Sequence, residues 1–261
     1  MKLHRIYAIL LRHMYLFRRS YDKMVDSFYW ITLDLLLWGI TGMYFQSITP
    51  DFQNVIFMIL SGVLLWNIVH RGQIDITSGL LEELWNKNLI NLFVSPLTFR
   101  EWIASLVALG FVKAIISFVF GSLITVLLYK FGILFYSVHL LAFMGLLIIS
   151  GWWIGFLVSS FILRFGTRVQ VLAWTFVWLA SPFSAVYYPV DILPSWVQVI
   201  TRIVPMSYVF EEARHLLYEG KIDYGQLGIS LVLSIIYSIL TFILLHRSFK
   251  AVLQKGLVKV Y

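Results

Sequence analysis

The sequence predicts an all-α integral membrane protein, and three observations predict it. Of the 261 residues, 60% are hydrophobic, and they come in long runs with few charges. About 20 apolar residues in a helix span the roughly 30 Å of a bilayer core. Backbone amides in lipid must be paired internally, so only helices or closed barrels cross it, and continuous rather than alternating apolar runs favour helices.

Transmembrane spans are expected in six places, and the basic residues set their direction. Lys and Arg favour the cytoplasmic side of a membrane. Lys and Arg collect before the first expected span and after the second, fourth and sixth. The opposite flanks hold only Lys130, Arg202, Arg214 and Lys221. We therefore expect both termini in the cytoplasm and a multi-pass protein of the inner (cytoplasmic) membrane. The six expected spans cover residues 27–48, 54–70, 102–129, 139–163, 169–187 and 226–245.

Three further segments are expected to lie at the membrane surfaces. In residues 1–22, apolar side chains recur at helical spacing opposite a basic face, which predicts an amphipathic interfacial helix. Residues 188–225 are broken by Pro189, Pro194 and Pro205 and are too polar for a span. They predict a helical hairpin before the last span, either re-entrant in the outer leaflet or interfacial. Residues 246–261 are expected to form a cytoplasmic tail.

The segment between the second and third expected spans reads RGQIDITSGLLEELWNKNLINLFVSPLTFRE. Ser78 is a candidate cap for a helix that begins near Gly79, and Pro96 cannot continue a helix. We expect a short cytoplasmic helix over residues 79–91 with one apolar and one acidic-polar face. Such a helix can dock into a groove of another protein, or it can simply cap the bundle.

Composition and missing motifs exclude several classes of function. The chain has no cysteine, so disulfides, cysteine-ligated zinc and thiol nucleophiles are excluded. The net charge of +7 is attributed to basic cytoplasmic flanks, and no nucleic-acid partner is expected. We find no H-E-x-x-H or G-x-S-x-G motif and no His cluster at ligand spacing, so no catalytic residue and no metal site are expected. No G-x-x-x-x-G-K-[ST] phosphate loop occurs either, so a process that this chain drives would take its energy from a partner or a gradient.

Two stretches carry a resemblance to a known family. SGLLEELWNKNLINLFVSPLTFREW resembles a cytoplasmic pattern of an acidic pair, a Leu, Ser-Pro-Leu and a charged residue before the next span. YYPVDILPSWVQVITRIVPMSYVFEEARHLLYEG resembles a segment that precedes the last span. With the basic amphipathic N-terminal helix, they resemble the permease of an ABC-2 type exporter over nearly the whole chain. The matching positions are Glu82, Glu83, Leu92, Ser95, Pro96, Leu97, Arg100 and Glu101, then Pro189, Leu193, Pro194, Trp196, Pro205, Met206 and Arg214.

The resemblance implies the membrane-spanning, non-catalytic half of an exporter. Two copies, identical or closely paralogous, would form a pathway for an amphipathic drug, lipid or glycoconjugate, in contact with membrane lipid. Two copies of a separate ABC ATPase would bind ATP and Mg, and this chain would carry no cofactor. Residues 1–22 would be a connecting helix and residues 79–91 the coupling helix on the ATPase. The residues implied to contact the ATPase are Leu80, Leu81, Glu82, Glu83, Leu84, Asn86 and Lys87.

Charged residues inside the expected spans are few. Asp34 and Lys113 lie in the first and third spans, and such charges face the bundle interior or water. We expect them to pair with each other. An ion pathway through them, in a secondary transporter or channel, is the alternative, and a membrane enzyme is the third class. Gly151 and Gly155 form a G-x-x-x-G pattern that allows close helix packing.

Overall fold

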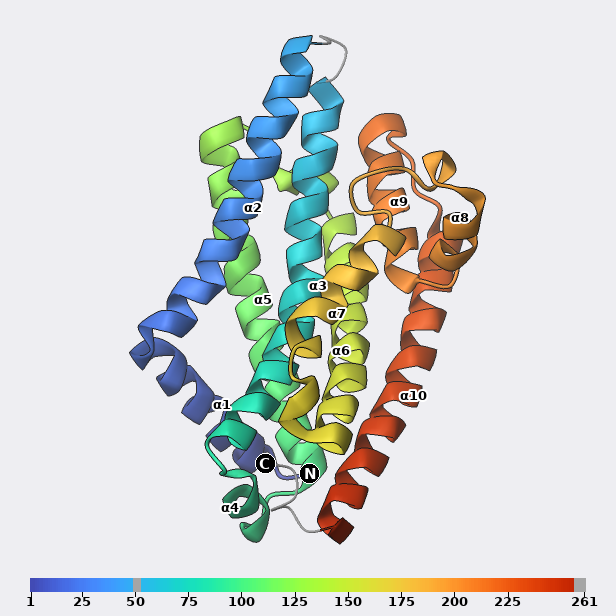
Figure 1. Ribbon diagram of the computed structural model, residues 1–261. Coiled ribbons are helices and arrows are strands. Elements are labelled where there is room, and N and C mark those ends of the chain that lie inside the picture. The colour runs from blue at the N-terminus through green and yellow to red at the C-terminus, as the bar shows by residue number, and fades with distance from the viewer. Residues whose placement is uncertain (49–52, 256–261) are drawn as a thin grey trace.

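The computed structural model describes residues 1–48 and 53–255, and within them it contains helices and turns but no strand (Figure 1). The part of the expected tail at residues 256–261 lies outside the described residues. The long helices run side by side along one axis. The helices are α1 (Leu3–Arg19), α2 (Tyr21–Ile48), α3 (Gln53–Trp85), α4 (Leu89–Val94), α5 (Phe99–Tyr129), η2 (Ile133–Tyr136), α6 (His139–Phe165), η3 (Gly166–Val169), α7 (Leu172–Ala180), η4 (Ser181–Phe183), η5 (Val190–Ile192), α8 (Ser195–Thr201), α9 (Pro205–Glu219) and α10 (Tyr224–Lys255).

In the part of the chain that the structure describes, five helices are long and apolar enough to cross a membrane, which fits a multi-pass membrane protein. They are α2, α3, α5, α6 and α10. At a rise of 1.5 Å per residue, the 33 residues of α3 extend about 50 Å and exceed the hydrocarbon core. The surplus lies at the end that holds α1, α4 and the last turns of α10 (Figure 1). We call it the basic end, because Arg5, Arg12, Lys23, Arg100 and Lys250 belong to its elements.

The expected span over residues 169–187 is not a single long helix. It contains α7, which has 9 residues, followed by the short helix η4. Nine helical residues rise only about 14 Å, less than half of a bilayer core. The helix ends where Pro182, which has no amide hydrogen, enters the next turn. The chain still climbs from the basic end to the opposite end along α7 and the turns that follow it (Figure 1).

Helix α3 lies at the centre of the bundle and packs against α2, α5 and α6. Apolar side chains on several of its faces are buried, including Leu60, Leu64, Leu65 and Ile68. A helix that is apolar all round is expected in such a central position.

Small residues bring α3 and α6 into close contact. A Cβ atom added to Gly151 would lie 2.6 Å from the carbonyl oxygen of Val69 and 3.0 Å from the Cα of Gly72. A Cβ on Gly155 would lie 3.1 Å from the Cβ of Ile76. Gly151 and Gly155 therefore form the close helix contact that the G-x-x-x-G pattern allows, and its partner surface is on α3.

The prediction of a separate short helix over residues 79–91 is wrong. Residues 79–85 continue α3, because the run from Leu80 to Trp85 consists of good helix formers. The helix ends only at a turn in which Lys87 has a φ of 51°, and α4 follows at Leu89–Val94. Thr98 then caps α5 through a reciprocal capping box with Glu101.

Two other expected boundaries also differ. The helix expected at residues 1–22 ends at Arg19, because Ser20 has an extended backbone. The tail expected from residue 246 is helical as far as Lys255 and simply continues α10.

At the end away from the basic end, η5, α8 and α9 fold back beside α10 and α6 (Figure 1). The prolines expected to break this segment do so. Pro189 and Pro194 precede η5 and α8 with extended backbones, and Pro205 occupies the first turn of α9. Gly220, with a φ of 68°, ends α9 in the left-handed conformation that glycine adopts readily.

Candidate functional site

The candidate functional site is the tip of the basic end, defined here as residues 85–96 between α3 and α5. On the apolar side of the tip, Leu89 and Leu92 are buried against the rest of the chain. Its outward side is open: Trp85 is 50% exposed and Val94 is 81% exposed. The tip is thus a compact knob with an exposed aromatic and an exposed aliphatic side chain.

Most residues expected to contact an ATPase do not lie on the tip surface. Leu80, Leu81 and Leu84 belong to the core of the bundle and are at most 1% exposed. Helix α3 places these three leucine side chains in the interior of this chain rather than on a surface that a partner could contact. Asn86 and Lys87 are exposed at the tip, as expected.

The acidic pair is bound within the chain. Arg12 Nη1 lies 2.8 Å from Oε1 of Glu83, and Asn88 Nδ2 donates to the other carboxylate oxygen over 2.6 Å. The Glu83 side chain is 1% exposed. Lys23 Nζ lies 2.7 Å from Oε1 of Glu82, which is only 24% exposed. These carboxylates therefore form ion pairs with α1 and α2 and do not face outward.

The Ser-Pro-Leu motif and Glu101 tie the start of α5 to α1. Arg5 donates to the carbonyl oxygen of Pro96 and lies 3.4 Å from Oε2 of Glu101. The backbone amide of Lys2 donates to Glu101 Oε1 over 2.7 Å. Ser95 Oγ donates to the carbonyl oxygen of Leu92, and the Leu97 amide donates to Ser95 Oγ. We call the ion pairs Arg5–Glu101, Arg12–Glu83 and Lys23–Glu82 the clamp.

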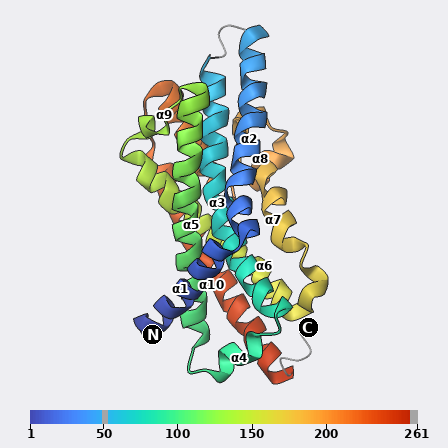
Figure 2. The same cartoon turned by 90° about the vertical axis from the view of Figure 1, so that its left-hand side faces the viewer.

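Helix α1 crosses the basic end obliquely, beside the start of α5 (Figure 2). It contributes a buried histidine, His13, which is 4% exposed. The pKa of His13 is lowered from 6.5 to about 4, chiefly by burial and also by the nearby Arg12, Lys23 and Lys113, while Glu83 opposes this shift. The imidazole is therefore neutral at pH 7.

The prediction that Asp34 pairs with Lys113 is wrong. Lys113 Nζ lies 2.6 Å from Oδ1 of Asp75 on α3. Ser117 Oγ donates to the carbonyl oxygen of Ser27, so α5 and α2 are in register at these residues. Asp34 then lies about seven residues above that level and Lys113 about four below it, which separates them by about 16 Å along the bundle.

The residue that sequence reasoning missed is Asp75. It lies in the stretch expected to be a loop, and α3 carries it into the interior, where it is 3% exposed. Arg71, four residues earlier on the same helix, is also buried and pairs with Asp26 at 3.1 Å. The spacing of Arg71 and Asp75 on a helix directly after an apolar run was the available signal.

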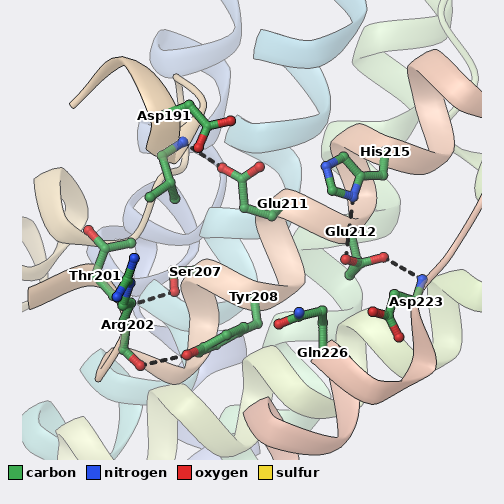
Figure 3. A pocket seen from close by; sticks show the side chains of 11 residues that line it. Asp191, Thr201, Arg202, Ser207, Tyr208, Glu211, Glu212, His215, Asp223 and Gln226 are labelled. Carbon is green, nitrogen blue, oxygen red and sulfur yellow. Dashed lines mark hydrogen bonds and ion pairs between the residues drawn. The ribbon is translucent and has the colours of Figure 1, made fainter. Parts of the chain in front are cut away.

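A polar pocket of about 290 Å³ lies at the opposite end, between η5, α8, α9 and the start of α10 (Figure 3). Glu212, at 1% exposure, accepts a hydrogen bond from the Asp223 amide over 2.7 Å and lies 3.4 Å from Nδ1 of His215. Glu211 accepts from the Val190 amide over 2.8 Å. These carboxylates join the connecting segments to α9. Within the described residues, no group of acidic or histidine side chains is arranged to hold a metal ion.

Arg214 pairs with Glu211 of this pocket and is 5% exposed. It lies 2.7 Å from Oε1 of Glu211 and donates to the carbonyl oxygens of Ala185 and Tyr188. Ala185 has a φ of 53°, so Arg214 holds a strained turn of the chain. The role implied for Arg214 is thus structural in this fold.

No protein-family model matches the chain, and no curated protein matches it.

Proposed function

We propose that this chain is the membrane-spanning permease subunit of an ABC-2 type exporter, driven by a separate ATPase. The observation that carries the proposal is the clamped tip. An exposed knob sits at the end of α3, and α3 runs without a break from the tip through the centre of the bundle. A push on the tip is thereby coupled to the helix that contacts α2, α5 and α6. The absence of a phosphate-loop motif from the sequence supports a separate ATPase.

The tip replaces the expected coupling helix as the proposed ATPase-binding surface. Its exposed residues are Trp85, Asn86, Lys87, Asn91, Val94, Ser95 and Pro96. Exposed aromatic and aliphatic side chains together with polar ones are a composition expected of a docking surface. The clamp would make α1 move with the tip, so that ATP-driven closure reaches the membrane surface as well as the bundle.

Six crossings with both termini in the cytoplasm are part of this proposal. The broken fifth crossing consists of α7, η4 and the turns after them, and the basic end faces the cytoplasm because Lys and Arg favour that side. The membrane would be the inner membrane, and the substrate an amphipathic drug, lipid or glycoconjugate.

A second copy would complete the pathway. Helix α2 exposes a stripe of large side chains at alternating spacings of three and four residues, which marks one helix face. These are Trp30, Leu33, Leu37, Ile40 and Tyr44. Such a stripe supports helix packing between two copies, either identical or closely paralogous.

Cross-linking from the tip tests the proposal. Because the chain has no cysteine, Lys87→Cys provides a unique reactive site. We expect a bifunctional reagent in native membranes to join it to an ATPase subunit. Lys221→Cys, exposed at the opposite end, is the matched control and should give no such product. Equal products from both positions, or none from residue 87, would contradict the proposed docking surface.

Ion-coupled transport is a second candidate, supported by the buried pair of Asp75 and Lys113. Within the described residues, Oδ2 of Asp75 is buried and has no hydrogen-bond partner. A buried carboxylate of this kind is a plausible proton or ion ligand. Transport that survives removal of ATP but stops on collapse of the ion gradient, and in Asp75→Asn, would favour this candidate.

A further inference from the structure

Helices α5 and α6 both pack on α3 but hardly touch each other. This arrangement leaves a cavity of about 570 Å³ between α5, α6 and α10. Ala104 and Ala108 of α5 line one side of it. Phe156 and Phe242 meet edge to face, with ring centroids 5.7 Å apart, on the other side. Except at its end, the lining is apolar.

The groove has the length of one lipid leaflet. Its lining on α5 extends from Arg100 to Phe111, about 16 Å along the helix, and half of a bilayer core is about 15 Å. A second apolar cavity of about 180 Å³ shares Phe111 and continues between α5 and α6 toward Leu141. The space is therefore elongated along the membrane normal.

A single hydrocarbon chain fits this space better than a helix does. A helix 10 Å across and 16 Å long occupies roughly 1,300 Å³, more than twice the volume of the larger cavity. Volumes of 300–1,000 Å³ are usual for small-ligand sites.

Positive charge marks one end of the groove. Arg100 lines the cavity where it opens at the basic end. Lys250 of α10 lies on the neighbouring helix end, since Phe99 and Phe249, the residues directly before the two cations, stack with ring centroids 4.2 Å apart. Among the described residues, neither Arg100 nor Lys250 has a carboxylate within ion-pair distance. The adjacent carboxylate, Glu101, is already occupied by Arg5.

We propose that this groove binds a phospholipid with an anionic headgroup. One acyl chain lies along Ala104 and Ala108, and the phosphate lies at Arg100 with Lys250 beside it. Basic sites between transmembrane helices at one membrane surface bind anionic headgroups in this manner, and Arg suits phosphate because it donates two parallel hydrogen bonds. The proposal does not depend on an ATPase partner.

Filling the groove tests the position of the acyl chain. Ala108→Trp should abolish retention of phosphatidylglycerol by the purified protein, measured by native mass spectrometry after delipidation and titration with that lipid. Leu123→Trp is the matched control, because Leu123 is 59% exposed on the same helix beyond the groove. It should retain the lipid like the unmodified protein. Retention that is unchanged in Ala108→Trp would overturn the proposal.

Removing the positive charge at Arg100 tests the position of the headgroup without filling the groove. Arg100→Gln should weaken phosphatidylglycerol binding about tenfold and remove its preference over phosphatidylcholine. Arg164→Gln, which removes an exposed arginine of α6 outside the groove, should leave both unchanged. Equal binding of the two lipids by the unmodified protein would overturn the anionic assignment. A change of oligomeric state in Ala108→Trp at unchanged lipid content would assign the groove to a second copy instead.

Discussion

Arg12 of α1 lies 2.8 Å from Glu83 of α3, and this pair joins the surface helix to the central helix directly above the tip. Glu83 is 1% exposed and Arg12 is 38% exposed, so the pair is sheltered on the carboxylate side only. The Coulombic attraction within such a half-sheltered pair is weaker than within a fully buried one, because solvent screens it. Its position, rather than its energy alone, makes it the link between α1 and the proposed docking surface.

Replacing Glu83 is expected to release α1. Glu83→Gln removes the charge that faces Arg12 while it keeps the side-chain shape. The free energy of unfolding should fall by about 1–2 kcal/mol. Hydrogen–deuterium exchange of the amides of α1 should rise, with little change in α5. Asp22→Asn is the control, because Asp22 is exposed and has no ion pair among the described residues. Equal exchange in both variants would show that the clamp does not hold α1.

Acid is expected to weaken the docking of α1 through His13. Its pKa is about 4 in the folded chain against 6.5 in the unfolded one, so the unfolded chain binds more protons between these pH values. Stability is full above about pH 6.5 and falls toward pH 4, by up to about 1.4 kcal/mol per pH unit. The melting temperature should fall between pH 7.5 and pH 5. His13→Phe cannot titrate and should show a smaller fall; an identical fall would assign the effect to other groups.

Enlarging Gly151 is expected to separate α3 and α6. A methyl group there meets the backbone of α3 at 2.6 Å, so Gly151→Ala forces the helices apart at a cost of about 1–3 kcal/mol. Gly145→Ala on the same helix is the control, since nothing lies within 4 Å of the added atom. The melting temperature should drop only in the first variant. A drop of equal size in both would mean that the close crossing is not what stabilises this pair.

A double-mutant cycle separates the two candidate partners of Lys113. Lys113→Met leaves a buried carboxylate unpaired and should cost about 3 kcal/mol in the free energy of unfolding. Adding Asp75→Asn should recover part of that loss, which gives a coupling energy well above the experimental error. The same cycle with Asp34→Asn should be additive within about 0.5 kcal/mol. Coupling to Asp34 and not to Asp75 would contradict the observed pair.

The sequence predicted the helical class and the long apolar helices because apolar run length reflects membrane thickness directly. It also predicted the break points at Pro189, Pro194 and Pro205, since proline acts locally. Helix ends without a local signal were missed. No proline separates Arg71 from Trp85, so α3 continues, and polarity alone had indicated a loop there.

The candidate site was predicted less well, because side-chain partners depend on tertiary packing. Glu82 and Glu83 resemble a surface pair in sequence, and only the fold shows that Lys23 and Arg12 cover them. The capping box of Thr98 and Glu101 was readable from its spacing and was overlooked. The break in the expected fifth span was also overlooked, although Pro182 marks it in the sequence.

The measurement that tests the central claim most directly is purification of the tagged chain from its native membrane, with identification of bound subunits and an assay of ATP hydrolysis. The account predicts a stoichiometric ATPase whose association is lost when Trp85 and Lys87 are replaced together by Asp, while the variant still folds. A stable complex without any ATPase would contradict the permease assignment and leave ion-coupled transport through Asp75 and Lys113 as the candidate function.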